Sequence, residues 1–457
     1  MDSWYSCTTV LPKTCIIGAG SCGIAAVKAL ADAGIPFDCF EKSDRVGGNW
    51  VFRNSNGMSS AYRSLHINTS RERMQFEDFP MPADYPDFPH HSQIAAYFDA
   101  YVDRFNLRDR ITFNTGVAHA ELRDGLWEIV LDTGERRTYD ALAVANGHHW
   151  DPQWPDPRFP GTFSGAEMHS HYYPEPEPFA GKRVVVVGMG NSAMDIAVEV
   201  SGVAARTFLS ARRGAYIVPK YILGRPFDQL AASHLIPWPV RRAVYSMLLR
   251  MSVGKVENYG LPKPDHRIGD AHPTISGRIL DRIGHGDVAP KPNIAELAGD
   301  RVRFADGSIE EVDTIIYCTG YKVTFPFFDE SFLSAPNNDL PLYKRVFKPG
   351  IPNLFFVGLL QPLGALMPLA ELQGRWIAAY LTGRYGLPSV DDMEREMARD
   401  REALQRRYVA SRRHTMQVDF DHYMHALRRE IRRGSSRASG MPVPARADTQ
   451  LREPVGA

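Results

Sequence analysis

Two glycine-rich turns, one near residue 18 and one near residue 188, constrain the fold of this 457-residue chain more than any other feature. Each turn follows a short run of β-branched and apolar residues, 14–17 in the first case and 183–187 in the second, and each precedes an apolar stretch with helical character. A buried strand, a glycine turn and a helix in this order form the parallel βαβ unit that binds dinucleotides. The chain is therefore predicted to be an α/β protein with two Rossmann-like dinucleotide-binding domains.

The first turn has the features of a site for the adenosine half of FAD or NAD. Gly18 permits the tight turn, Gly20 lets the backbone approach a pyrophosphate, and Gly23 lets the helix pack closely on the strand. Glu41 ends the next strand, where a carboxylate accepts hydrogen bonds from ribose hydroxyls and repels a 2′-phosphate. The residues expected to contact this cofactor are Gly18, Gly20, Ser21, Cys22, Gly23, Glu41 and Lys42.

The second turn is followed by a strand that ends at Ser210 and then by Arg212. Ser210 can donate to a phosphate and Arg212 can bind one through paired N–H groups, whereas a carboxylate is absent there. This chemistry favours NADPH over NADH; an exposed basic turn without a ligand is the alternative, because Arg pairs are common on protein surfaces. The residues expected to contact NADPH are Gly188, Gly190, Asn191, Ser192, Ser210 and Arg212, with Ala193 in the place of the third glycine.

Composition along the chain predicts how these domains are arranged. Residues 174–178 alternate Pro and Glu, which excludes a helix or a central strand, so a domain boundary is expected there. Two dinucleotide sites in one chain imply a flavoprotein that takes hydride from NADPH. We therefore predict that 1–178 begins an FAD-binding domain, that an NADPH-binding domain is inserted at 179–322, and that 323–433 returns to complete the first domain. Residues 215–290 are predicted to be an insertion with one helix, 239–252. The tail, 434–457, is rich in Ser, Gly, Pro and Ala and is expected to be disordered.

The balance of charge excludes several classes of partner. Lys plus Arg equals Asp plus Glu at 53 each, so no net field draws the protein to nucleic acid or to an anionic membrane. The five cysteines form no CxxC pair and no cluster with zinc spacing, so we expect no metal and a reducing cytoplasm. No signal peptide is visible at the N-terminus, and the longest apolar run, 354–370, is too interrupted to span a bilayer.

Further stretches resemble one family, the flavin-containing monooxygenases among the class B flavoprotein monooxygenases. Residues 45–50 are similar to its RxGGxW segment, 163–173 to FxGxxxHSxxY, 188–197 to GxGNSAxDIA, and 318–321 to ATGY with Cys in place of Ala. Residues 64–70 resemble the segment with the active-site asparagine, and 358–376 resemble the C-terminal flavin-contacting block. The resemblance runs in the family's order from Thr14 to about Met424.

The resemblance implies a mechanism and a set of residues. NADPH would pass hydride to FAD, NADP⁺ would stay bound, and the reduced flavin would react with O₂ to give a C4a-hydroperoxide that oxygenates a nucleophilic nitrogen or sulfur of a small-molecule substrate. It assigns to Asn68 a hydrogen bond to NADP⁺ and to the peroxyflavin. Contact with the flavin is implied for Gly47, Gly48, Asn49, Trp50, Thr319, Gly320 and Gln361. The chain lacks the apolar membrane-anchoring tail of animal members, so it resembles the shorter soluble microbial form; a homodimer stays open.

Alternatives remain at this point. Pro174 after Tyr173 is similar to the Baeyer–Villiger signature, although Tyr in place of Trp favours the monooxygenases proper. A pyridine nucleotide–disulfide reductase needs a cysteine pair beside the flavin, which Cys15 and Cys22 cannot form across the turn. A degenerate flavin-binding protein without activity is a further alternative. His169 could act as a general base, but a positioning role is favoured because this chemistry supplies no obvious proton to abstract; Asn68 could be an ordinary turn residue.

The cofactor preference leads to a first test. Arg212→Ala should weaken NADPH binding roughly 10- to 150-fold, because losing a bidentate charge-assisted contact costs about 1.5–3 kcal/mol. NADH lacks the 2′-phosphate, so its affinity should stay nearly unchanged. Fluorescence titration of both nucleotides measures the two dissociation constants, and equal losses would mean that Arg212 has only a structural role.

Overall fold

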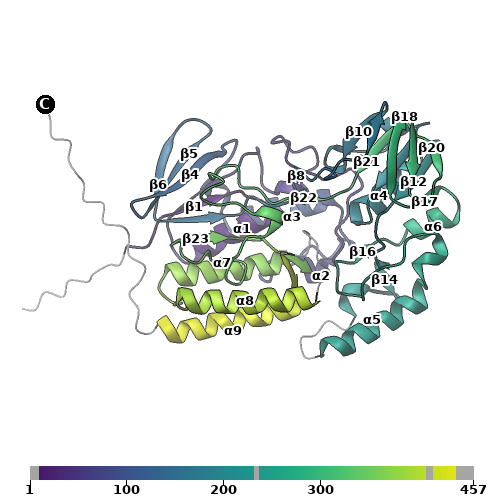
Figure 1. Cartoon of the computed structure of the whole chain (residues 1–457). Coiled ribbons are helices and arrows are strands. Elements are labelled where there is room, and N and C mark those ends of the chain that lie inside the picture. The colour runs from purple at the N-terminus through teal and green to yellow at the C-terminus, as the bar shows by residue number, and fades with distance from the viewer. Residues whose placement is uncertain (1–9, 231–235, 408–414, 439–457) are drawn as a thin grey trace, which may run out of the picture.

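Two parallel sheets, each at the centre of its own domain, organise the chain (Figure 1). The structure is a computed structural model, which describes residues 10–230, 236–407 and 415–438. The first domain contains the purple N-terminal strands and the green and yellow C-terminal helices (Figure 1). The second domain is formed by the teal middle of the chain (Figure 1). The predicted pair of Rossmann-like folds is confirmed.

The first sheet has the strand order β23-β7-β1-β2-β3. Its strands are β1 (Thr14–Ile17), β2 (Phe37–Phe40), β3 (Ile111–Thr112), β7 (Ala141–Val144) and β23 (Leu354–Phe356). All four residues of β1 are buried, as expected for a parallel strand covered on both faces. Because β23 pairs in parallel with β7, the chain after the second domain returns to this sheet.

Helices α1 (Ser21–Asp32), α3 (His91–Arg104) and α7 (Met367–Leu381) cover one face of the first sheet with a continuous apolar core. The approach of α7 to α1 is close because Gly374 has no side chain: a Cβ there would lie 3.1 Å from the Ala25 carbonyl oxygen. The C-terminal segment therefore supports the helix that follows the first glycine turn.

The second sheet has the order β10-β21-β11-β12-β17. Its strands are β10 (Ala166–His169), β11 (Arg183–Val187), β12 (Arg206–Ser210), β17 (Val288–Lys291) and β21 (Thr314–Tyr317). Helix α4 (Asn191–Val200) follows β11 and packs on this sheet. Strand, glycine turn and helix thus repeat the unit of the first domain.

The first domain boundary lies earlier than residue 178. Strand β10 precedes the Pro174–Pro178 segment, yet it pairs with β21 in the second sheet. The chain crosses between the domains at β8 (Asp151–Pro152) and β22 (Tyr321–Lys322), which pair antiparallel. The boundary predicted at 178 is wrong, because the proline-rich segment marks a break in regular structure inside the second domain and not a change of sheet.

The insertion is shorter than predicted at its C-terminal end. Strand β17 is an edge strand of the second sheet, and α6 (Ile279–Gly284) packs against α4, so the segment after about residue 278 belongs to the domain. Within the insertion, α5 (Trp238–Ser252) occupies the place of the predicted helix 239–252. Two pairs of short strands, 217–218 with 274–275 and 221–222 with 225–226, interrupt the otherwise mostly irregular segment that the composition indicated.

Smaller elements surround the two sheets. The additional strands are β4 (Val117–Arg123), β5 (Leu126–Leu131), β6 (Arg136–Tyr139), β9 (Gly161–Phe163), β13 (Ile217–Val218), β14 (Tyr221–Ile222), β15 (Arg225–Pro226), β16 (Thr274–Ile275), β18 (Ile294–Gly299), β19 (Arg301–Phe304), β20 (Ile309–Glu311), β24 (Gln361–Leu363) and β25 (Gln417–Asp419). The additional α-helices are α2 (Arg71–Met74), α8 (Val390–Arg407) and α9 (Phe420–Ala438). Within the three described ranges, no helix has the length and apolar character needed to cross a membrane.

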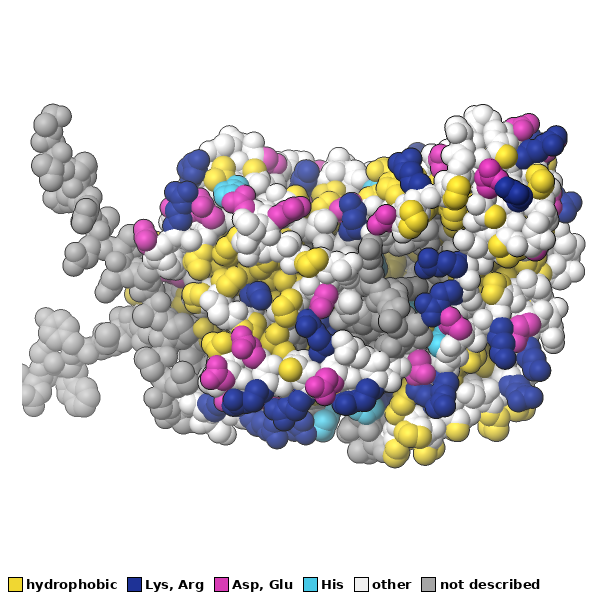
Figure 2. Space-filling model, viewed as in Figure 1, with side chains coloured by type: hydrophobic (Ala, Val, Ile, Leu, Met, Phe, Trp, Pro, Cys, Tyr) yellow, Lys and Arg dark blue, Asp and Glu magenta, His cyan; other side chains and the backbone are white. Residues whose placement is uncertain are grey.

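Helix α9 carries the arginine clusters of the C-terminal region. Arg428, Arg429, Arg432 and Arg433 are exposed, and Lys and Arg side chains gather along the lower edge of the molecule, over this helix (Figure 2). Glu430 between them is buried and accepts from the Tyr385 hydroxyl at 2.8 Å. The clusters are therefore a solvated face of a helix whose opposite side packs inward.

The predicted disordered tail begins too early. Residues 434–438 continue α9, and the rest of the predicted tail lies outside the described residues. Gly434 is buried against the Tyr385 ring, and a Cβ there would lie 1.8 Å from Tyr385 Cε2. Glycine at this position serves close packing, which composition alone could not distinguish from a flexible linker.

This packing can be tested by stability. Gly434→Ala should lower the free energy of unfolding by about 1–3 kcal/mol because the methyl group overpacks the Tyr385 ring. Helix propensity alone would favour alanine by about 1 kcal/mol. Urea unfolding of this variant beside Ser436→Ala, which changes an exposed residue of the same helix, separates the two effects; a Gly434→Ala protein as stable as the parent would contradict the packing.

Candidate functional site

The first glycine turn has the geometry of a pyrophosphate site. Gly18 has φ +97° and donates its N–H to the Phe40 carbonyl at 2.8 Å. A Cβ on Gly23 would lie 1.9 Å from the Gly18 carbonyl oxygen, so only glycine lets α1 begin this close to the turn. Gly20 is different, because a Cβ there would meet only the Gly48 Cα, at 3.8 Å. The space in front of Gly20 is open to a ligand.

The start of α1 can hold an anion. Gly20 is its N-cap, no side chain caps the helix, and its first turn contains no acidic residue. The unpaired N–H groups of a helix N-terminus and the helix dipole favour a phosphate there. Gly47 and Gly48 close the opposite side: Gly47 donates its N–H to the Ala19 carbonyl at 3.1 Å, and both have positive φ.

Glu41 braces the same turn. Its Oε2 accepts from the Ala19 N–H at 2.7 Å and its Oε1 from the Ser43 N–H at 2.8 Å. A carboxylate has about four acceptor positions, so each oxygen keeps one for a ribose hydroxyl. Glu41 therefore braces the turn and keeps acceptor positions for the ribose hydroxyls that the sequence predicts there.

The other residues predicted to contact FAD differ in their surroundings: some are bonded or packed within the protein, and one is exposed. Asn49 Oδ1 accepts from the Ser60 N–H and hydroxyl at 2.8 and 2.9 Å, so its amide oxygen shapes the loop. Trp50 is half-buried beside the apolar core of the first domain. Ser21 is buried at the start of α1, and Lys42 is exposed. Cys22 packs against Gly358, where a Cβ would lie 2.1 Å from its sulfur.

The C-terminal block acts partly through packing. Gln373, fully buried on α7, accepts from the Gly358 N–H at 2.8 Å and donates to the Tyr423 hydroxyl at 2.8 Å. Gln361 is half-buried at the start of β24, which pairs with β25. The block thus holds Gly358 and Cys22 beside the first turn.

The second glycine turn repeats the first one. Gly188 has φ +138°, and a Cβ there would lie 2.6 Å from the Cys318 carbonyl oxygen. Gly190 is the N-cap of α4, again without a side-chain cap or an acidic residue in the first turn. Ala193 is fully buried, and Ser192 is half-buried at the second position of the helix.

The insertion covers this second turn. Asn191 Oδ1 accepts from the Ile275 N–H at 2.8 Å, and the Thr274 hydroxyl donates to the Met189 carbonyl at 2.5 Å. Asn191 is therefore oriented by the insertion, which the sequence did not indicate.

The end of β12 changes one prediction about the nucleotide phosphate. Ser210 is fully buried and its hydroxyl donates to the Pro292 carbonyl at 2.8 Å, so the expected donation from Ser210 to a phosphate does not fit this structure. Arg212 is exposed. Arg213 instead pairs with Asp265 at 2.7 Å, which makes Arg213→Ala a matched control for Arg212→Ala.

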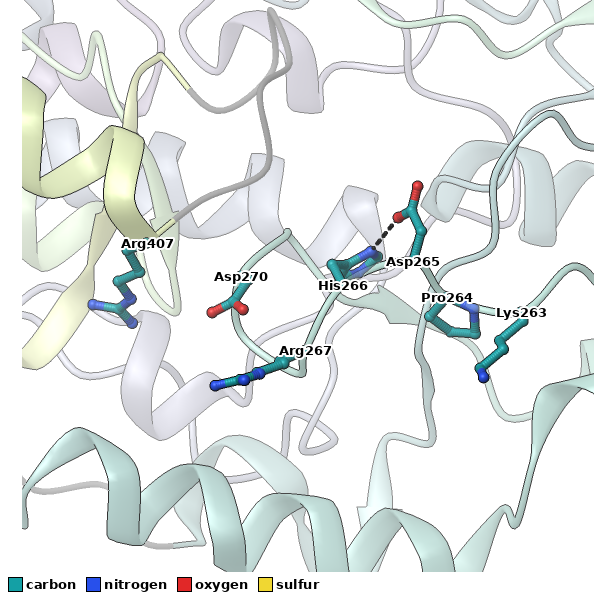
Figure 3. Close-up of a pocket in the computed structure, with 7 residues that line it drawn as sticks. All are labelled: Lys263, Pro264, Asp265, His266, Arg267, Asp270 and Arg407. Atoms are coloured by element: carbon teal, nitrogen blue, oxygen red, sulfur yellow. Dashed lines mark hydrogen bonds and ion pairs between the residues drawn. The ribbon is translucent and has the colours of Figure 1, made fainter.

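The loop that holds Arg213 also lines an open hollow of about 700 Å³ (Figure 3). Its lining residues are Lys263, Pro264, Asp265, His266, Arg267, Asp270 and Arg407, the last from the end of α8. Asp265 points to His266, whose Nδ1 lies 3.0 Å from Asp265 Oδ1 (Figure 3). None of the predicted cofactor residues lines this hollow.

Thr319 and Gly320 lie at the interdomain crossing. The Thr319 hydroxyl donates to the Gln153 carbonyl at 2.5 Å, and Gln153 donates its N–H back to the Gly320 carbonyl at 2.9 Å. They follow β21 of the second sheet, next to the turn at Gly188. Their backbone therefore joins the two crossings.

His169 is fully buried at the end of β10, and burial lowers its pKa to about 4. Its Nδ1 accepts from the His171 N–H at 3.1 Å, and its ring lies against Trp154 and Tyr321. These contacts fit the positioning role that the sequence favours for His169.

The loop that carries Asn68 is held on several sides. Lys220 Nζ donates to the Ile67 carbonyl at 2.9 Å, and Asp228 Oδ2 accepts from the Ser70 N–H at 2.8 Å and from its hydroxyl at 2.9 Å. The Thr69 hydroxyl donates to the Gly364 carbonyl at 3.4 Å. Contacts from the insertion and from the C-terminal block therefore fix the backbone around Asn68.

The segment just before this loop docks on the second domain. The Tyr62 hydroxyl donates to Asp195 of α4 at 2.5 Å, and the Ser64 hydroxyl donates to Glu199 of the same helix. Burial raises the pKa of both carboxyl groups. Lys220, Asp228 and Asp195 were not predicted as site residues, because their role depends on long-range contacts and no local motif or spacing marks it.

Comparison with known proteins agrees with this geometry. Residues 12–436 match the family model described as flavin-binding monooxygenase-like. The chain belongs to this family. It is 38% identical to human flavin-containing monooxygenase 5 over 437 residues, which cover 91% of this chain and 82% of that protein.

Two further similarities were found. The chain is 35% identical to mouse dimethylaniline monooxygenase [N-oxide-forming] 2, over 92% of this chain and 82% of that protein. The solved structure of S-allyl-L-cysteine S-oxygenase from Allium sativum superposes with a TM-score of 0.70 at 25% identity, over 94% of this chain and 89% of that one.

This flavin monooxygenase uses FAD and NADPH. The open space at Gly20, the uncapped starts of α1 and α4, and the braced Glu41 fit two dinucleotides. In the described part of the chain, no group of three or more His, Cys, Asp or Glu side chains is placed to hold a metal ion.

The role of the first turn can be tested by closing the space in front of it. Gly20→Val places two methyl groups where the pyrophosphate would lie, while the extended backbone at Gly20, φ −68° and ψ −175°, accepts valine. The protein should fold and purify without FAD. Flavin absorbance per protein measures occupancy, and full occupancy would contradict the assignment.

Gly23→Ala is the matched control for that variant. Its methyl group meets the Gly18 carbonyl and not the open space, so it should lower the thermal unfolding temperature of the protein even before FAD is added. Gly20→Val should leave that temperature, measured without FAD, nearly unchanged.

Proposed function

We propose that this monooxygenase transfers one oxygen atom from O₂ to a nucleophilic nitrogen or sulfur of a small molecule. We also propose that Asn68 forms hydrogen bonds that keep the bound cofactors in the state that transfers this oxygen. Bound FAD, reduced by NADPH, supplies the oxygen activation. The protein must orient the two cofactors and exclude water, since early release of the oxygen yields hydrogen peroxide.

The surroundings of the Asn68 amide carry this proposal. Asn68 is half-buried, and none of the described residues forms a hydrogen bond with its side chain. By contrast, Asn49, Asn54 and Asn191 all use their amides within the protein. A fixed backbone that presents an amide with two free donors suits a ligand better than a turn.

The substrate needs little from the protein in this chemistry. An amine or a thioether already has a nucleophilic lone pair, so a general base is not required. His169 is buried and its pKa is lowered to about 4, so it is uncharged at neutral pH and stays a positioning residue. The names of the N-oxide-forming and S-oxygenase relatives support the same choice of substrate.

The substrate class is tested with a panel. NADPH oxidation should be coupled to product with tertiary amines and thioethers, with hydrogen peroxide measured in parallel. Exclusive oxygenation of ketones would mean that the enzyme is a Baeyer–Villiger monooxygenase. An FAD-loaded protein that does not oxidise NADPH would favour the non-catalytic alternative.

The cytoplasmic location stays a prediction.

The role of Asn68 has its own test. Asn68→Leu, similar in volume but unable to donate, should leave anaerobic flavin reduction by NADPH fast. Losing one hydrogen bond to a charged or polarised group costs about 1.5–3 kcal/mol. The rate at which the oxygenating state of the enzyme is lost without product would then rise by roughly one to two orders of magnitude. The electrons should then appear as hydrogen peroxide.

Asn68→Asp is a second variant of nearly the same shape: an oxygen replaces the amide nitrogen, so the side chain keeps its size and its Oδ1 acceptor but loses both donors. It should show the same shift from product to peroxide. Product yields per NADPH equal to those of the parent in both variants would contradict the role of Asn68.

A further inference from the structure

An ion network joins the insertion to the first domain; its centre, Arg241 with Asp419, is buried, and Asp421 and Arg73 beside it are half-buried. Arg241, on α5, is 4% exposed, and its guanidinium donates to Asp419 at 3.0 Å and to Asp421 at 3.4 Å. Asp421 also accepts from Arg73 at 3.1 Å. Arg407 approaches Asp419 at 3.5 Å, and the His422 Nδ1 lies 2.9 Å from the same carboxylate.

Besides the end of α8, which carries Arg407, the network joins three segments that are far apart in the sequence. Arg241 comes from the insertion, Asp419 and Asp421 lie at the junction of β25 and α9, and Arg73 lies on α2. Helix α2 begins directly after Ser70, so the last member of the network is on the segment that carries Asn68. Strand β25 pairs with β24, which leads to the Gly364 carbonyl that Thr69 contacts.

Burial makes this contact cooperative. Removing a charge from water is costly, and that cost is offset only when its partners are in place. If α5 moved away, Asp419 would lose its closest arginine, and the carboxylate of Asp421 would keep Arg73 alone among the arginines of the network. The seated position of α5 and the position of α2 are therefore favoured together.

We propose that Arg241 is a positioning residue for the monooxygenase reaction: it seats the insertion on the first domain and, through Asp421 and Arg73, holds α2 and thereby the loop of Asn68. The inference rests on the proposed role of Asn68. The insertion would thereby help the enzyme to transfer oxygen to the substrate and not to lose it as hydrogen peroxide.

The first measurement needs no cofactor turnover. In hydrogen–deuterium exchange of the purified protein, Arg241→Met should speed exchange in both 238–252 and 67–75, by about 5- to 30-fold. Arg73→Met breaks only the last link and leaves Arg241 paired with Asp419, so it should speed exchange in 67–75 and affect 238–252 less than Arg241→Met does. Unchanged exchange in 67–75 for both variants would overturn the proposal.

The second measurement is the yield of product per NADPH. Both variants should lose yield to hydrogen peroxide while anaerobic flavin reduction stays as fast as in the parent, a split that general destabilisation would not produce. Arg241→Lys keeps the charge but cannot reach both carboxylates in the same way, so it should restore part of the yield. If Arg241→Met does not fold, Arg73→Met and Arg241→Lys decide the question.

Arg242→Met is the matched control. Arg242 neighbours Arg241 on α5 and lies over the same Trp238 ring, but its ion pair is with Asp270 inside the insertion. This variant should keep the parent's yield, and a loss equal to that of Arg241→Met would overturn the proposal. If Asn68→Leu keeps full yield, the proposed function fails; if Asn68→Leu loses yield but Arg241→Met and Arg73→Met do not, only this inference fails.

Discussion

The pairing of the two interdomain crossings determines how the two dinucleotide folds face each other. Strands β8 and β22 are hydrogen-bonded to one another, and Gln153 exchanges contacts with Thr319 and Gly320 at their ends. The Lys322 ammonium lies 3.2 Å from the Asp151 carboxylate across the same pair. Hydride can pass only between cofactors that meet, so the two sites work together only in an arrangement that these crossings help to fix.

The insertion adds a second set of constraints between the domains. It orients Asn191 at the second glycine turn and holds the Asn68 loop through Lys220 and Asp228. Its helix α5 reaches the C-terminal segment through Arg241. Most of these contacts use charged or amide groups that are largely buried, which makes them directional and sensitive to the loss of one partner. The loop with the proposed oxygen-holding residue therefore has little freedom of its own.

The errors of prediction share one physical cause. The Pro174–Pro178 segment, the C-terminal limit of the insertion and the start of the tail were all assigned from local composition. Strand pairing decided the first two, since β10 and β17 join the second sheet. Packing against Tyr385 decided the third, because Gly434 lies inside α9. Ser210 was assigned by its place at the end of a strand, but its hydroxyl donates to the Pro292 carbonyl.

The sequence by itself determined the two glycine turns, the strands before them and the family. These features are local: Gly18, Gly23 and Gly188 are needed because a side chain would collide with backbone atoms within one strand–turn–helix unit or with the adjacent strand. Only the tertiary structure decided which side chains surround Asn68, and that Lys220, Asp228 and Arg241 hold its loop from the insertion. Contacts between residues more than a hundred positions apart leave no periodicity or spacing in the sequence, because their geometry arises only when both sheets and the insertion have assembled.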